Sequence, residues 1–237
     1  MNQTAGNKFV KDYYFFDLVH LFYPQLCASC GDVLLRGEHT VCLRCLAALA
    51  YTDYHLQKNN KVEKLFWGRF PVERAASYLH FRKGTRVQKL MHQLKYRGKS
   101  EVGNFLGNQF GARLLENNWL NDIDLIAPVP LHPTKQQQRG YNQSERIAQG
   151  LSEASNILLV PDLIKRNVYT QTQTRKSRLK RWDNVEQVFE CKEKFDAKHV
   201  LIVDDIITTG ATIEACANAL LKMSTVKISV ASLASTV

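Results

Sequence analysis

Apolar residues recur along the chain with two periods, and these periods predict strands alternating with helices. Short apolar runs predict buried strands at 72–81, 123–129, 200–203 and 226–233. Apolar residues at helical spacing predict helices at 85–96, 102–115, 144–155 and 211–223. Strands alternating with helices are typical of a parallel sheet with flanking crossover helices, so the pattern predicts an α/β fold.

Two further segments complete the expected organisation. Residues 13–23 place apolar side chains on one helical face and predict a docking helix that ends at Pro24. Residues 165–184 are polar, basic and nearly free of aliphatic side chains, which predicts a mobile loop. The expected domains are an N-terminal helix with a cysteine-bearing unit, a linker and the α/β domain, at residues 1–50, 51–71 and 72–237.

The composition narrows the class of protein. Of the 237 residues, 45% are hydrophobic, which suffices for a buried core and excludes a wholly disordered chain. The formal net charge of +10 favours anionic partners such as phosphorylated metabolites, nucleic acid or a membrane surface. Solvated lysines without a partner are the alternative.

No secretory signal and no membrane span are predicted. The apolar stretch from Tyr13 to Tyr23 is broken by Asp17 and His20 and lacks a small-residue cleavage site. It is also about half as long as a helix that spans a bilayer. A cytoplasmic location is expected, and in that reducing compartment clustered cysteines indicate a metal site rather than disulfides.

Four cysteines near the N-terminus have the spacing of a structural zinc site. Two Cys-x₂-Cys pairs are separated by eleven residues, and their members are Cys27, Cys30, Cys42 and Cys45. Four thiolates close the tetrahedral shell of Zn²⁺ and leave no bound water to activate, so the expected Zn²⁺ is structural. A redox centre or an iron–sulfur site is the alternative. His39 could replace one ligand, while Cys191 and Cys216 lie far away in the sequence and are expected to be ordinary thiols.

The stretch from Val200 to Thr212 carries the most chemistry. Its apolar start predicts a buried strand, Asp204 and Asp205 follow, and a turn rich in Thr and Gly opens a helix. Ligands of open α/β sheets bind beyond the carboxyl ends of the strands, where a helix N-terminus offers unpaired N–H groups to a phosphate. The carboxylates can accept hydrogen bonds from ribose hydroxyls, and Gly210 lets the backbone approach the ligand. The stretch therefore predicts a sugar 5-phosphate site, the alternative being an ordinary strand and helix with polar caps.

An earlier strand-end loop offers candidate ligands for a pyrophosphate. The run from Pro128 to Lys135 leads into the segment from Arg139 to Glu145, and Ser144 begins the next predicted helix. Lys135 and Arg139 carry charges that would neutralise a pyrophosphate in the same crevice. A surface loop stiffened by prolines is the alternative.

All thirteen positions from Val200 to Thr212 resemble the motif with which type I phosphoribosyltransferases bind 5-phosphoribosyl 1-pyrophosphate (PRPP). The resemblance implies that the acidic pair holds the ribose hydroxyls and that the Thr/Gly loop holds the 5-phosphate. The implied PRPP-binding residues are Asp204, Asp205, Thr208, Thr209, Gly210, Ala211 and Thr212. In that family PRPP normally carries Mg²⁺ on its pyrophosphate, so Mg²⁺ is implied as well.

Further motifs narrow the resemblance. After the cysteines, three motifs occur in a fixed order, at Leu94–Gly98, Pro128–His132 and Arg139–Gln143. With the acidic motif, this combination is similar to the ComF/GntX family of competence-associated phosphoribosyltransferase-like proteins, across roughly residues 15–235. The resemblance implies a type I phosphoribosyltransferase fold with an N-terminal zinc knuckle. It also implies a cytoplasmic role in natural transformation, handling incoming single-stranded DNA.

Basic side chains crowd two segments of the chain. They are Arg82, Lys83, Arg86, Lys89, Lys95, Arg97 and Lys99 in the first, and Lys165, Arg166, Arg175, Lys176, Arg178, Lys180 and Arg181 in the second. In type I enzymes a loop at the second position closes over PRPP, and Arg175, Lys176 and Arg178 are candidates for stabilising the departing pyrophosphate. The surplus charge favours single-stranded DNA, with stacking faces at Tyr96, Tyr169 and Trp182. A solvated charged loop is the alternative.

Two functions from different classes are compatible with these features. The first is a pentosyltransferase that moves phosphoribose from PRPP to an unknown acceptor, with catalytic residues that the sequence does not reveal. The second is a catalytically idle adaptor that binds single-stranded DNA or a competence helicase. A PRPP-sensing regulator is a third, weaker hypothesis.

Overall fold

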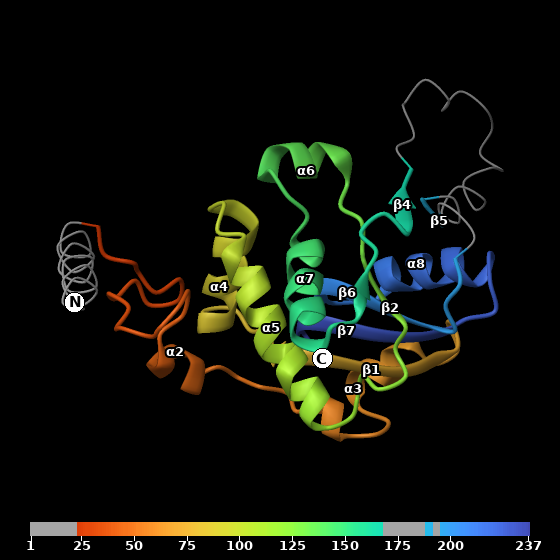
Figure 1. The fold of residues 1–237 in the computed structure, drawn as a ribbon, viewed down its shortest axis with the longest axis horizontal. Coiled ribbons are helices and arrows are strands. Elements are labelled where there is room, and N and C mark those ends of the chain that lie inside the picture. Colours follow the sequence, from red (N-terminus) through yellow and green to blue (C-terminus); the bar gives the residue numbers. More distant parts are fainter. Residues whose placement is uncertain (1–22, 168–187, 192–194) are drawn as a thin grey trace, which may run out of the picture. The chain divides into compact units, whose positions relative to one another are not determined.

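The computed structural model describes residues 23–167, 188–191 and 195–237, and the chain divides into two compact units, Met1–Ala48 and Leu49–Val237 (Figure 1). The docking helix expected at 13–23 lies outside the described residues, apart from Tyr23.

The first unit is small and is built around its cysteines. Its one described helix, α2 (Leu43–Ala47), is short, and antiparallel bridges pair Leu26 with Val33 and His39 with Val41. Two glycines with positive φ, at 31 and 37, make the turns of this unit. So small a unit buries few apolar side chains, which makes a bound metal a natural source of its stability.

The second unit contains a five-stranded, all-parallel sheet in the order β1-β7-β6-β2-β3. Its strands are β1 (Val72–His80), β2 (Leu125–Pro128), β3 (Leu158–Leu159), β6 (His199–Ile207) and β7 (Lys227–Ser235). Along most of its length β7 is buried, as is the first half of β6, because helices cover both faces of the sheet. The first strand along the chain, β1, pairs with the last, β7, and in this pairing Ala76 lies opposite Ala231.

Four long helices cover this sheet (Figure 1). They are α4 (Arg86–Tyr96), α5 (Glu101–Glu116), α7 (Gln143–Ser155) and α8 (Ala211–Leu221). From β1 to β3 the chain adds strands toward one edge of the sheet, and from β6 to β7 it moves toward the other edge. Right-handed crossovers therefore place α4, α5 and α7 on one face and α8 on the other. Among the described residues, no helix is long and apolar enough to cross a membrane.

Glycines let two of these helices touch backbone to backbone. A Cβ atom added at Gly107 of α5 would lie 2.2 Å from the carbonyl oxygen of Ile147 in α7. A Cβ atom added at Gly150 of α7 would lie 2.0 Å from the carbonyl oxygen of Asn104 in α5. Either side chain would force the helices apart, so the close packing of this face depends on both glycines.

The segment 51–71, which the sequence suggested was a linker, is folded against the sheet. It contains a 3₁₀ turn, η1 (Tyr54–Leu56), and the short helix α3 (Lys61–Phe66). Phe66 is fully buried. The Asn60 side chain caps α3 and donates to three backbone carbonyl groups, one of them on β1. The single apolar residues of this segment follow no regular period, which is why the pattern did not predict it.

A second, two-stranded sheet brackets the basic loop. Strands β4 (Ile164–Arg166) and β5 (Phe189–Cys191) pair in antiparallel fashion, and the Asn167 N–H donates to the Val188 carbonyl at 2.9 Å. The start of the expected mobile loop is thus a strand. Residues 168–187, with Tyr169 and Trp182, lie outside the described residues.

The other expected helices and strands are confirmed, with ends that differ by a few residues, and the sheet also contains the short strand β3, which the apolar pattern does not predict. Strand β6 runs to Ile207 rather than Val203, so Asp204 and Asp205 lie within the strand. The run expected to be a loop contains the short helix α6 (Pro133–Arg139), which starts at a proline and ends at Gly140 with a φ of 80°.

Candidate sugar-phosphate site and cysteine cluster

Asp204 lies at the carboxyl end of the central strand and is held by two donors. The Ser144 hydroxyl, from the first turn of α7, donates to Asp204 Oδ1 at 2.9 Å. The backbone N–H of Asp205 donates to the same oxygen at 2.8 Å. Ser144 had been expected only as the start of a helix, and the structure shows that it also fixes the first acidic side chain.

Asp205 is held by a lysine from another helix. The Lys95 ammonium lies 2.8 Å from Asp205 Oδ2, and the two side chains are only 21% and 15% exposed. In the sequence, Lys95 is one of seven basic residues at 82–99 and nothing distinguishes it from the others. No periodic signal joins a helix end to a strand that comes far later in the chain, although Lys95 lies within one of the family motifs.

Burial changes the acidity of the first carboxyl group. Desolvation, followed by the charge of Asp205, raises the pKa of Asp204 to about 7. The hydrogen bonds from the Asp205 N–H and Ser144 and the charge of Lys95 oppose this rise. Near neutral pH, Asp204 is therefore present in both its protonated and its ionised form.

The expected phosphate loop follows β6 directly. The Thr208 and Thr209 side chains are exposed, while Gly210 is buried and begins α8 with a φ of 75°. A Cβ atom at Gly210 would lie 2.7 Å from Phe66 Cε1, so both the backbone conformation and the space require glycine. Ala211 and Thr212 are exposed in the first turn of α8, where N–H groups and the helix dipole favour an anion.

Arg69 supports this loop, and the sequence analysis missed it. Its Nη1 donates to the carbonyl oxygen of Thr209 at 2.7 Å and lies 3.4 Å from Glu214 Oε2 on α8. A lone arginine in a presumed linker gives no sequence signal of such a role.

The motif at residues 139–143 ties three elements together. The Asn142 side chain donates to the Val129 carbonyl at 3.0 Å and accepts from the Ser144 N–H at 3.1 Å. The Tyr141 hydroxyl donates to the Leu94 carbonyl at the end of α4. The motif thereby joins the loop after β2, the start of α7 and the helix that carries Lys95.

The pyrophosphate candidates lie on α6 or outside the described residues. Arg139 donates to Gln143 Oε1 at 2.7 Å and stacks over the Tyr96 ring at 5.3 Å, whereas Lys135 is exposed. Arg139 thus contacts Tyr96, the neighbour of Lys95 in the sequence. The loop candidates Arg175, Lys176 and Arg178 lie outside the described residues.

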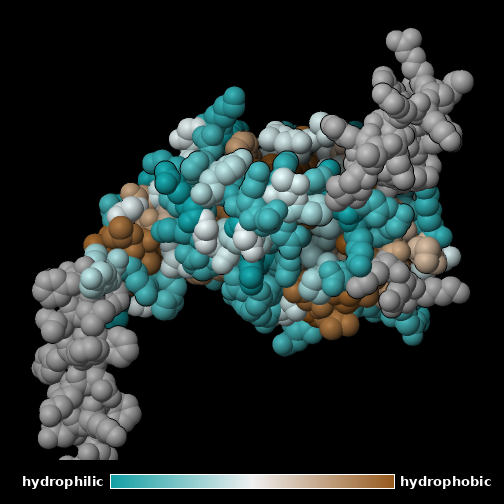
Figure 2. Space-filling model, turned by 90° about the horizontal axis from the view of Figure 1, so that it is seen from above, coloured by the Kyte–Doolittle hydropathy of each residue, from teal (hydrophilic) through white to brown (hydrophobic). Residues whose placement is uncertain are grey.

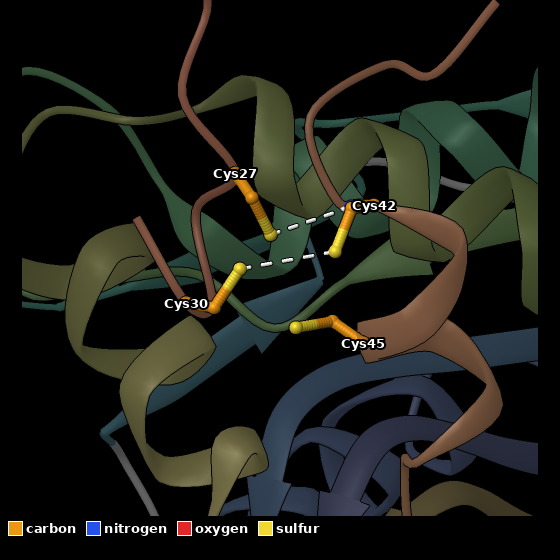
Figure 3. A group of neighbouring side chains, drawn as sticks. All are labelled: Cys27, Cys30, Cys42 and Cys45. Carbon is orange, nitrogen blue, oxygen red and sulfur yellow. Dashed lines mark hydrogen bonds between the residues drawn. The ribbon is translucent and has the colours of Figure 1, made fainter. Parts of the chain in front are cut away.

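The four cysteines of the first unit converge as expected (Figure 3). Their Sγ atoms all lie within 4.8 Å of one another, and those of Cys30 and Cys42 are 3.8 Å apart. Tetrahedral Zn²⁺ with bonds of about 2.3 Å requires sulfurs roughly 3.8 Å apart. The cluster therefore fits a metal ion bound by four thiolates. His39 does not belong to it.

Backbone donors around Cys27 favour its thiolate. Burial alone would raise the pKa of Cys27, but N–H groups of Cys30, Cys42 and Ser29 outweigh burial and lower it to about 6. The N–H groups of Ser29 and Cys42 lie 3.4 Å and 3.3 Å from this sulfur. Such N–H···S contacts stabilise a metal-bound thiolate.

The fold and the strand-end site define a phosphoribosyltransferase-type protein. The phosphoribosyl transferase domain family matches residues 133–236, which include the acidic pair and the phosphate loop. Among solved structures, an allosteric regulatory enzyme of purine biosynthesis is 20% identical, with a TM-score of 0.39, over 56% of this chain and 26% of that one. The parallel sheet with its flanking helices and the family match at residues 133–236 confirm the predicted phosphoribosyltransferase-type fold.

Relatives confirm the ComF family, which the motifs had indicated. The DNA utilization protein YhgH of Escherichia coli K12 is 28% identical over 83% of this chain and 84% of its own length. Competence protein F of Haemophilus influenzae is 36% identical over 47% of this chain and 50% of its own. Competence protein ComFC of Bacillus subtilis is 26% identical over 57% of this chain and 54% of its own. The chain is thus similar to competence-associated proteins over most of its length, and residues 133–236 match a phosphoribosyltransferase-type domain.

Proposed function

We propose that this protein binds PRPP with Mg²⁺ at the carboxyl end of β6 and transfers its phosphoribose to an acceptor during DNA uptake. The observation that carries this proposal is the continuous arrangement of two carboxylates, an exposed Thr/Gly turn and the N-terminus of α8. Carboxylates accept from ribose hydroxyls, and the helix N-terminus accommodates a phosphate.

Each part of the ligand has matching groups. Asp204 and Asp205 accept from the two ribose hydroxyls, while the backbone and hydroxyl groups of 208–212 surround the 5-phosphate. The pyrophosphate provides oxygen ligands for Mg²⁺, which prefers oxygen. Lys135 and Arg139 on α6, with Arg175, Lys176 and Arg178, are the proposed cationic partners of the pyrophosphate.

The proposed reaction is a substitution at the ribose C1 atom. The C1–oxygen bond to pyrophosphate breaks, pyrophosphate leaves with the electron pair, and the acceptor forms a bond to C1 and loses a proton. The cationic side chains near the pyrophosphate stabilise its growing charge. The acceptor and the group that takes its proton are left unassigned.

The biological setting of the proposal comes from the relatives, whose names refer to competence and DNA utilization. The proposed use of PRPP, which is an intracellular metabolite, also favours a cytoplasmic location. We further propose Zn²⁺ as the metal of the cysteine cluster, in a structural role, since four thiolates leave no open coordination position.

The second candidate function is an adaptor for single-stranded DNA or a competence helicase. It is favoured by exposed basic side chains in α4 and immediately before and after it, among them Arg82, Lys83, Arg86, Lys89 and Arg97. The Tyr96 ring is 65% exposed beside them. In the view of Figure 2, hydrophilic side chains cover most of the visible surface and hydrophobic ones form separate patches. Charge with an exposed ring suits a single strand better than an apolar protein interface.

Calorimetry with PRPP and Mg²⁺ tests the first function. The wild type is expected to bind, and Asp204→Ala with Asp205→Ala is expected to lose affinity by at least about a hundredfold, from two lost hydrogen bonds to charged groups. Asp196→Ala, an exposed carboxylate before β6, is the control. Equal affinity of the double variant and the wild type would refute the proposal. Release of pyrophosphate with a panel of bases and amines then separates an enzyme from an idle binder.

A further inference from the structure

The contact between Lys95 and Asp205 joins a helix end to the centre of the sheet. Lys95 is the penultimate residue of α4, and its amine reaches one of the two adjacent carboxylates at 2.8 Å. Two carboxylates on neighbouring residues repel each other, and burial strengthens that repulsion. An amine at this position offsets part of that repulsion.

The position of Lys95 is fixed from two sides. On α4, the side chains of Leu90, Met91 and Leu94 are buried. Their burial fixes the rotation of the helix about its axis. The Tyr141 hydroxyl donates to the Leu94 carbonyl and holds the last turn. The amine is therefore directed at the site by packing, unlike the exposed basic side chains of the same helix.

We infer that Lys95 is a binding residue of the sugar-phosphate site. Its amine contacts the pyrophosphate of the ligand while the amine remains beside Asp205. The inference rests on the function proposed above. A lysine amine has three N–H donors, so one can remain on Asp205 while another reaches a phosphate oxygen. The amine contacts Oδ2 of Asp205, and the carboxylate has a second oxygen with which to accept a ribose hydroxyl. The ion pair and the contact with the ligand can therefore exist together.

The inference also has a consequence for pH. The ionisable side chains facing Asp204 are Asp205 on its own strand, Lys95 from α4 and Cys216 from α8, with Arg166 of β4 beyond Cys216. Lys95 is the cation that opposes the rise in the pKa of Asp204. Removing this cation would raise the pKa of Asp204 further, and ligand binding that needs an ionised Asp204 would shift to higher pH.

The test compares Lys95→Met, Lys95→Arg and Lys227→Met by calorimetry with two probes, PRPP–Mg²⁺ and pyrophosphate–Mg²⁺. Lys227 is 61% exposed at the opposite end of the strands and serves as the matched loss of one positive charge. Lys95→Met is expected to weaken both probes roughly tenfold or more. Lys95→Arg is expected to restore part of the affinity, and Lys227→Met to change it by less than about twofold. The pH midpoint of PRPP binding is expected to rise in Lys95→Met, which a merely structural role would not cause.

The outcomes separate this inference from the proposed function. If the wild type binds PRPP and Lys95→Met binds it equally well, the role of Lys95 is overturned while the function stands. If PRPP is not bound but pyrophosphate is, and Lys95→Met loses it, the function fails and the role of Lys95 stands. Binding of neither probe by the wild type overturns both. The melting temperature of each variant shows whether it is folded. If Lys95→Met is misfolded, Lys95→Arg provides the test. A folded Lys95→Arg that binds PRPP weakly with an unchanged pH midpoint would also overturn the binding role of Lys95.

Discussion

Asp204 combines burial with a position that is proposed to bind the ligand, and the two requirements oppose each other. The burial that fixes its carboxyl group between Ser144 and the Asp205 N–H also raises its pKa to about 7. A carboxyl group whose pKa rises on folding binds its proton more tightly in the folded state. The free energy of unfolding must therefore fall as the pH rises from about 4 to about 7.

Asp204→Asn should remove this pH dependence. The neutral isostere is expected to unfold with about 1–3 kcal/mol more free energy than the wild type at pH 8 and with a similar value at pH 4, where Asp204 is protonated. Guanidinium unfolding at both pH values measures the difference. Asp196→Asn, on the surface before β6, is the control and should leave the pH profile unchanged. Parallel profiles for Asp204→Asn and the wild type would contradict the assignment of this pKa.

The sequence predicts ligand-binding residues at the end of β6, but it does not predict the residues that hold them in place. The adjacency of Asp204 and Asp205 and the Thr/Gly turn are local features, so the sequence shows them directly. The partners Lys95, Ser144 and Arg69 come from other elements. Their positions depend on how helices pack on the sheet, and a single sequence carries no signal for a contact between distant segments.

Among the elements, the long amphipathic helices and buried strands were predictable and the short polar ones were not. The helix α4 buries Val87, Leu90, Met91 and Leu94 at helical spacing. By contrast, α6 has no buried residue, so no apolar period marks it. The helix α3 has only six residues, and its Asn60 cap and its burial of Phe66 emerge only in the folded unit.

The contact between α5 and α7 predicts a large effect from a single methyl group. Gly107→Ala would place its Cβ atom against a backbone carbonyl, which cannot rotate away as a side chain can. The variant is expected to lose about 1–3 kcal/mol of unfolding free energy because the helices must move apart. Chemical denaturation measures this loss.

Gln109→Ala, at an exposed position of the same helix, is the matched control and should change the unfolding free energy by less than about 0.5 kcal/mol. If both substitutions proved equally mild, the close approach of the two helices would be wrong.

At the scale of the whole molecule, the two compact units predict separable losses. Cys27→Ser with Cys42→Ser should remove one tightly held Zn²⁺ per chain, measured by elemental analysis of protein purified without added metal. Structural Zn²⁺ provides roughly 10–16 kcal/mol to a small domain, so the first unit should unfold. Because the sheet and the acidic pair belong to the other unit, PRPP binding should persist. A wild type without zinc, or a variant that retains it, would contradict the assignment.

The distribution of charge predicts weak, salt-sensitive binding of single-stranded DNA. Each basic side chain that contacts a phosphate should contribute about 0.7 to the slope of log affinity against log salt. Arg86→Ser with Lys89→Ser should flatten this slope, as should serine at Arg175, Lys176, Arg178, Lys180 and Arg181. Lys198→Ser with Lys227→Ser, exposed at the other end of the strands, is the control for α4. If single-stranded DNA did not bind even at low salt, the basic loop would keep only its proposed role with PRPP.

The pairing of β1 with β7 governs when this protein can fold. Its long edge strand is synthesised first, and the strand that hydrogen-bonds to it is synthesised last. At 5–20 residues per second, β1 leaves the ribosome roughly 10–30 s before its partner. During that time an apolar strand with an unpaired edge is exposed to other nascent chains. The sheet, and with it the proposed ligand site on β6, can therefore form only after translation of this domain is nearly finished, and we expect co-expression of a chaperone to raise the yield when expression is fast.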